Sequence, residues 1–156
     1  MVCCDGTVDP TNPKTVRASA GSIFHLPVVL GGDPHAVIGA LRGWGMAVVG
    51  TLVRGGVDYA EFDWRQRTAV VFGNEASGLD PSVTELLDQR VSIPMGGRAE
   101  SLNVSVSTGV LCFEALRQRR LGGGRPTSVG GRAVGPTMPG MEAGRPTDPG
   151  EGDRAR

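Results

Sequence analysis

Short apolar runs alternate along this chain with segments whose apolar residues recur at helical spacing. The apolar runs predict strands at residues 2–4, 24–30, 46–51, 69–72 and 91–93. Apolar residues three or four positions apart predict helices at residues 34–42 and 101–120. A turn-rich stretch before Lys14 and a stop at Gly21 predict a short helix at 14–20, and a cap signal at Asp80 predicts one at 81–87. Because strands and helices alternate with short connections, we expect an α/β domain with a mostly parallel sheet and helices on both faces.

Two of the predicted helices begin with the same local signal. Asp33 and Asp80 are each followed by a proline. An aspartate can accept a hydrogen bond from an unpaired amide of the first helical turn, and proline suits the first helical position. The run at 69–72 has no polar interruption, which is typical of a strand buried on both faces of a parallel sheet.

Glycine and proline, 25 and 11 of the 156 residues, are concentrated at the end of the chain. Residues 121–156 contain ten glycines and five prolines but few apolar side chains. Such a composition buries too little surface to offset the entropy lost on ordering. We therefore expect one folded domain at residues 1–120 and a disordered tail at residues 121–156.

Charge and cysteine content narrow the class of protein. The 16 basic and 16 acidic residues cancel, which argues against nucleic-acid binding by overall charge but leaves local basic patches possible.

The cysteines Cys3, Cys4 and Cys112 lack metal-ligand spacing, and we interpret them as buried thiols in a reducing cytoplasm. His25 and His35 have no ligand partner nearby, so we expect no metal. No apolar run reaches the ~18 residues of a membrane span, and we expect a soluble cytoplasmic protein without a membrane partner.

Three turns that follow predicted strands contain the candidate chemistry. They are residues 51–53, 73–78 and 94–103, of which the last two contain two glycines each. Ligands bind at the carboxyl ends of strands in parallel α/β sheets, and glycine lets the backbone approach a ligand closely. We expect these turns to form a cleft with exposed backbone amides and carbonyls, which suits a flat polar ligand.

The second and third turns carry specific motifs. Residues 70–79 read Val-Val-Phe-Gly-Asn-Glu-Ala-Ser-Gly-Leu, and residues 93–105 read Ile-Pro-Met-Gly-Gly-Arg-Ala-Glu-Ser-Leu-Asn-Val-Ser. These segments resemble the second and third signature motifs of the SpoU (TrmH-like) RNA 2′-O-ribose methyltransferases of the SPOUT class. Residues 9–21 and 108–115 are similar to further segments of that family, so the resemblance covers about residues 2–120.

The resemblance implies a fold and a cofactor. Members of this family have a deep C-terminal trefoil knot, a rare feature that periodicity does not predict. They bind S-adenosyl-L-methionine in the knot, largely through main-chain groups, and usually form homodimers beside this cleft. Carried over by position, the cofactor contacts are Gly73, Ile93 and Leu102, with Thr51 and Met95 as additions. We expect that a side chain at position 73 would fill the space where backbone meets cofactor.

The reaction implied by the resemblance is transfer of a methyl group to a ribose 2′ oxygen of ribosomal or transfer RNA. The 2′ hydroxyl is a weak nucleophile, so it must be aligned and helped to lose its proton. Ser101 and Asn103 match positions of the family's catalytic pocket, and Glu75 matches an acidic position of the second motif. The residues alone allow simpler roles: Ser101 can cap the last helix, Asn103 can satisfy backbone groups, and Glu75 can close its turn.

One family element has no counterpart in this sequence. The first motif, Asn-x-Gly-x-x-x-Arg, supplies an arginine that assists proton removal, and it is absent here. Arg17 follows Asn12 at a spacing one residue too short; a surface position or a substrate phosphate contact suits it better than catalytic replacement. We therefore predict an RNA 2′-O-methyltransferase domain that loss of the first motif impairs. The alternatives are a non-catalytic knotted remnant that binds cofactor or RNA, and a generic nucleotide-binding domain, against which the missing Gly-rich phosphate loop argues.

Overall fold

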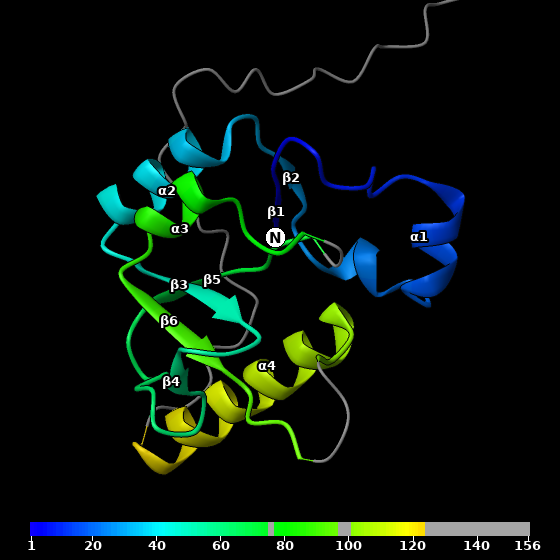
Figure 1. The fold of residues 1–156 in the computed structure, drawn as a ribbon. Coiled ribbons are helices and arrows are strands. Elements are labelled where there is room, and N and C mark those ends of the chain that lie inside the picture. Colours follow the sequence, from blue (N-terminus) through cyan, green and yellow to red (C-terminus); the bar gives the residue numbers. More distant parts are fainter. Residues whose placement is uncertain (75–76, 97–100, 124–156) are drawn as a thin grey trace, which may run out of the picture.

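The computed structural model describes residues 1–74, 77–96 and 101–123. Strands and helices alternate along the chain, as the pattern predicts (Figure 1). In chain order the elements are β1 (Val2–Cys3), α1 (Pro13–Ala18), the 3-10 helix η1 (Ser22–His25), β2 (Val29–Leu30), α2 (Pro34–Gly43), β3 (Ala47–Leu52), β4 (Val57–Asp58), β5 (Thr68–Val71), α3 (Pro81–Glu85), β6 (Gln89–Ser92) and α4 (Val104–Leu121).

All described strand pairs are parallel. Four strands form one sheet in the order β4-β6-β3-β5, and β1 pairs with β2 in a second, two-stranded sheet. β3 lies between two partners, because Val49 is in register with Val70 of β5 and with Gln89 of β6. The predicted α/β class with a parallel sheet is therefore confirmed.

Neighbouring residues of β3 point to opposite faces of the larger sheet and divide the core into two layers. Val48 packs with Ile38 of α2 and Val83 of α3, and all three are buried. Val49 lies in the other cluster with Leu111 of α4 and Trp64, which is only 1% exposed. Helices thus cover both faces of the sheet, as predicted; α2 and α3 lie together and α4 lies apart from them in Figure 1.

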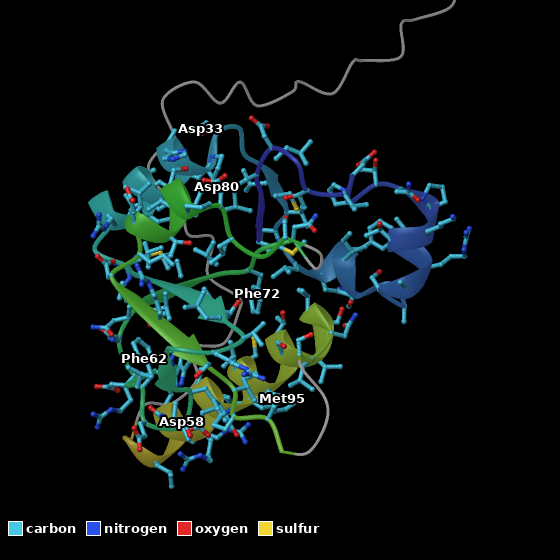
Figure 2. The ribbon with its side chains drawn as sticks, in the orientation of Figure 1. Asp33, Asp58, Phe62, Phe72, Asp80 and Met95 are labelled. Atoms are coloured by element: carbon cyan, nitrogen blue, oxygen red, sulfur yellow. The ribbon has the colours of Figure 1, made fainter. Side chains whose placement is uncertain are left out.

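Both predicted aspartate caps are confirmed. The carboxylate of Asp33 accepts a hydrogen bond from the amide of Ala36 at 3.1 Å, and that of Asp80 accepts one from the amide of Ser82 at 2.8 Å. Asp33 and Asp80 are labelled at the helix starts in Figure 2. Hydrogen bonds from the hydroxyl and then the amide of Ser82 hold the pKa of Asp80 below its ordinary value.

Two strand predictions are wrong in part. The segment 24–30 is not one strand: it begins inside η1, and only Val29–Leu30 pairs with β1. Pro27 explains this break, because proline donates no backbone hydrogen bond to a sheet. The run at 69–72 is an edge strand, since β5 pairs only with β3 among the described strands. Its four residues are half-buried instead of buried on both faces.

The interpretation of three buried thiols also needs correction. Cys3 is buried, Cys4 is half-buried and Cys112 is exposed on α4. Within the part of the chain that the structure describes, no helix combines the length and apolar character of a membrane span. Residues 124–156 of the predicted disordered tail lie outside the described residues, so its disorder stays a prediction.

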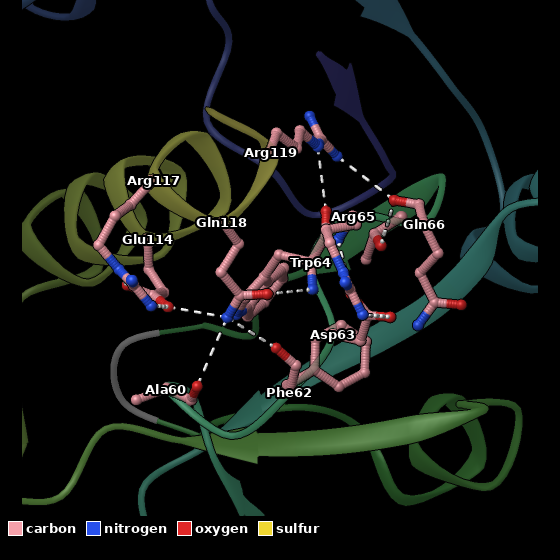
Figure 3. Close-up of polar contacts among 11 residues, drawn as sticks. Ala60, Phe62, Asp63, Trp64, Arg65, Gln66, Glu114, Arg117, Gln118 and Arg119 are labelled. Atoms are coloured by element: carbon pink, nitrogen blue, oxygen red, sulfur yellow. Dashed lines mark hydrogen bonds and ion pairs between the residues drawn. The ribbon is translucent and has the colours of Figure 1, made fainter. Parts of the chain in front are cut away.

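The segment between β4 and β5 is fastened to α4 by polar contacts (Figure 3). The Gln118 side chain accepts a hydrogen bond from the amide of Trp64 at 2.9 Å and donates one to the carbonyl of Phe62 at 3.0 Å. Arg119 donates to the carbonyl of Trp64 at 3.0 Å. These contacts hold the second half of α4 against the sheet, so that its first half extends beside the carboxyl ends of the strands.

Candidate functional site

A cavity of about 520 Å³ lies at the carboxyl ends of β3, β5 and β6, against the start of α4. Its size is typical of small-molecule sites. The three strands are parallel and adjacent, so the loops that follow them reach the same edge of the sheet. Phe72 directly after β5 and Met95 beyond β6, both labelled in Figure 2, belong to its lining.

The structure brings most of the predicted site residues together. The cavity is lined by seven of them: Thr51, Gly73, Ile93, Met95, Ser101, Leu102 and Asn103. Arg17 is exposed on α1 and does not line this cavity. Glu75 lies outside the described residues.

The loop after β5 owes its shape to two glycines. Asn74 and Gly78 exchange backbone hydrogen bonds of 2.9 and 2.8 Å, and Gly78 has a φ of 73°, which favours glycine. A Cβ atom on Gly73 would collide with the carbonyl group of Gly78 and the amide of Leu79. Gly73 lines the cavity, as expected. The expected reason for a glycine here is wrong, because a side chain at position 73 would collide with the backbone of Gly78 and Leu79 and not with a ligand.

The first turns of α4 form one wall of the cavity. Asn103 is the N-cap of this helix, and its side-chain oxygen accepts a hydrogen bond from the amide of Ser105 at 2.9 Å. The helix therefore begins after Asn103, and the alternative that Ser101 caps it is wrong. The predicted backbone role of Asn103 is confirmed.

Sequence reasoning missed two residues of this wall. Ser107 and Leu111 line the cavity one and two helical turns beyond Asn103. A signal for them was present, because residues four positions apart share one helix face. To use this spacing, one must know which face of α4 turns toward the strands. The weak amphipathic pattern of α4 does not indicate that face.

The described lining is uncharged. It combines apolar side chains with hydroxyl and amide groups, and it includes no Asp, Glu, His, Lys or Arg among the residues that the structure describes. These residues can bind and orient a ligand by hydrogen bonds and apolar contact, but their side chains do not exchange protons near neutral pH. Among the described residues, no group of three or more His, Cys, Asp or Glu side chains could hold a metal ion.

Comparison with known proteins gives a consistent result. The SpoU rRNA Methylase family matches residues 1–113. The chain is 38% identical over 113 residues to the 23S rRNA (guanosine(2553)-2'-O)-methyltransferase RlmP of Bacillus subtilis. This match covers 72% of this chain and 45% of that protein. It is 39% identical over 124 residues to the 23S rRNA (uridine(2479)-2'-O)-methyltransferase of Streptomyces viridochromogenes, covering 76% of this chain and 43% of that protein. The chain thus spans less than half the length of these two relatives.

Solved structures agree with the sequence relatives. The SpoU methyltransferase AviRb from Streptomyces viridochromogenes, in complex with the cofactor AdoMet, superposes with a TM-score of 0.71 at 38% identity. That match covers 77% of this chain and 49% of AviRb. The TrmH/SpoU tRNA modifying enzyme of A. aeolicus superposes with a TM-score of 0.67 at 29% identity, covering 81% of this chain and 66% of that one.

Proposed function

Since this chain belongs to the SpoU rRNA Methylase family, we propose that it forms the cofactor-binding part of an S-adenosylmethionine-dependent RNA 2′-O-ribose methyltransferase. The observation that carries the proposal is the cavity in which residues of the second and third motifs meet at the carboxyl ends of three parallel strands. The resemblance to AviRb, solved with AdoMet, supports the choice of cofactor. The substrate class, ribosomal or transfer RNA, follows the printed names of the relatives.

The residues of the cavity fit S-adenosylmethionine. Apolar side chains such as Ile93, Leu102 and Leu111 can pack on a purine ring, and uncharged hydroxyl and amide groups can hydrogen-bond its ribose and heteroatoms. We assign Gly73, Ile93 and Leu102 as cofactor contacts, with Thr51 and Met95 beside them. When bound, the cofactor supplies an electrophilic methyl group on a sulfonium.

Residues at the rim of the cavity suit the RNA substrate. Ser101 and Asn103 are exposed and line the cavity entrance at the start of α4. We propose that they orient the ribose 2′ hydroxyl and that Glu75 of the second motif helps to organise the site. For Arg17, exposed on α1, we propose an RNA phosphate contact outside the cavity.

A specific observation favours a second candidate function. The sequence contains no Asn-x-Gly-x-x-x-Arg element. A chain without the first motif can keep the cavity but lack proton removal, which would make it a cofactor- or RNA-binding protein without activity.

Two measurements separate these functions. Titration calorimetry tests S-adenosylmethionine binding, and transfer of labelled methyl from the cofactor to ribosomal and transfer RNA tests catalysis. Binding with transfer supports the enzyme, and binding without transfer supports the non-catalytic alternative. If the folded chain binds no S-adenosylmethionine, the proposed function is refuted.

We also propose that α4 forms a homodimer interface and that the chain has the trefoil knot of its family. Val106 and Phe113 lie two turns apart on one face of α4 and are 52% and 74% exposed. Two large apolar side chains on one exposed helix face are typical of an interface. The adjacent face of α4 lines the cavity, so such a dimer would form beside the cofactor site.

A further inference from the structure

The wall that α4 contributes to the cavity changes in exposure along the helix. Asn103 at the helix start is exposed, Ser107 one turn later is half-buried, and Leu111 after another turn is only 2% exposed. All three line the cavity. The exposed rim suits a large substrate such as RNA, and the deeper part suits a small ligand that the cavity encloses.

The Ser107 hydroxyl has no hydrogen-bond partner within the part of the chain that the structure describes. Its neighbour Thr108 donates its hydroxyl to the carbonyl of Val104 at 2.8 Å, which is the usual partner four residues back in a helix. The carbonyl of Asn103, four residues before Ser107, accepts the ordinary helical hydrogen bond from the backbone amide of Ser107 at 2.9 Å, which leaves the Ser107 hydroxyl unused. Ser107 is also flanked in the lining by two apolar α4 residues, Val104 and Leu111.

A ligand that fills the cavity displaces water from the Ser107 hydroxyl, which is costly unless the ligand itself hydrogen-bonds this group. We infer that the Ser107 hydroxyl hydrogen-bonds S-adenosylmethionine, as a cofactor-binding residue outside the two motifs that indicated the site. The inference rests on the proposed function. Because Ser107 lies deeper than Asn103 and Ser101, its contact is with the cofactor and not with the RNA ribose.

The test compares Ser107→Ala with Ser105→Ala. Ser105 is exposed on the same helix, does not line the cavity, and contributes its backbone amide to the Asn103 cap, which alanine retains. Titration calorimetry of each variant with S-adenosylmethionine and with S-adenosylhomocysteine gives the dissociation constants. Loss of one hydrogen bond to an uncharged group predicts about three- to tenfold weaker binding of both ligands by Ser107→Ala. Ser105→Ala should match the wild type.

A melting curve without ligand separates binding from structure. Alanine has a higher helix propensity than serine, so Ser107→Ala should melt no lower than the wild type if its hydroxyl serves only the ligand. Equal S-adenosylmethionine affinities of the wild type and Ser107→Ala would overturn the inference. An equal loss of affinity in Ser107→Ala and Ser105→Ala would also overturn it. If the wild type binds S-adenosylmethionine but Ser107→Ala is unaffected, the proposed function survives. Absence of binding by the folded wild type would refute both.

Discussion

Gln118→Ala removes the side chain that joins α4 to the segment before β5. In the wild type this amide accepts from the Trp64 amide and donates to the Phe62 carbonyl, at 2.9 and 3.0 Å (Figure 3). Phe62 and Trp64 are buried, 7% and 1% exposed, and pack edge to face in the core beside α4. The hydrogen bonds therefore hold a loop whose aromatic side chains form much of one core layer.

The expected loss of stability in Gln118→Ala follows from its hydrogen bonds to the Trp64 amide and the Phe62 carbonyl. A net 0.5–1.5 kcal/mol for each hydrogen bond gives a loss of about 1–3 kcal/mol in the free energy of unfolding. For a folded unit of this size, that corresponds to a melting temperature lower by roughly 4–12 °C. The weaker contact to the Ala60 carbonyl, at 3.4 Å, adds little to this sum. The Gln118 side chain also donates to the Glu114 carboxylate at 2.7 Å. Glu114 keeps its two hydrogen bonds from Arg117 in the variant, so this third contact places the expected loss toward the upper end of the range.

Urea denaturation followed by tryptophan fluorescence measures the change, because Trp64 lies in the affected layer. Gln66→Ala is a matched control: Gln66 is exposed in the same region, and only its backbone carbonyl accepts hydrogen bonds there. The control should unfold as the wild type does. If Gln118→Ala stays within ~0.5 kcal/mol of Gln66→Ala, the bridge between α4 and the loop does not stabilise the fold, and the reasoning is refuted.

Three further predictions test the electrostatics, the loop and the interface. Hydrogen bonds from Arg117 and then Gln118 lower the pKa of Glu114 from 4.5 to about 2. Because the folded value lies below the unfolded one, the stabilisation by Glu114 is present above pH 4.5 and is lost as the pH falls toward 2. Glu114→Gln should therefore lose less melting temperature between pH 6 and pH 2.5 than the wild type, and parallel pH profiles would contradict this. Gly73→Ala should lower the melting temperature and abolish cofactor binding, because its methyl group collides with the backbone at Gly78, whereas Gly96→Ala, with open space at its Cβ, should do neither. Unimpaired calorimetric binding by Gly73→Ala would show that the loop tolerates the change. Phe113→Ser should shift the sedimenting species from dimer to monomer while the far-UV circular dichroism stays that of the folded chain, because this ring is 74% exposed in the single chain; a monomeric wild type would refute the proposed interface.

Helix starts were predicted well because their signals are local. Asp33 and Asp80 each accept from an amide two or three residues later, so neighbours in sequence suffice to form the cap. For α4 the sequence also allows a cap at Ser101, but Asn103 makes the capping hydrogen bond. Both residues suit a cap chemically, and only the backbone path of the preceding loop distinguishes them. The prediction of one strand over 24–30 is wrong because it follows the apolar composition and gives no weight to Pro27 inside the segment.

Periodicity and local capping were enough to predict an α/β domain, its parallel strands and the two glycine-containing loops of its site. Those properties depend on residues close together along the chain. The tertiary structure decided which faces meet: Val48 and Val49 separate the two core layers, β5 lies at an edge, and Ser107 and Leu111 turn toward the cavity. Gln118 likewise finds its partners more than 50 residues away. Such contacts depend on strand register and on how a helix lies across a sheet, which no short stretch of sequence specifies.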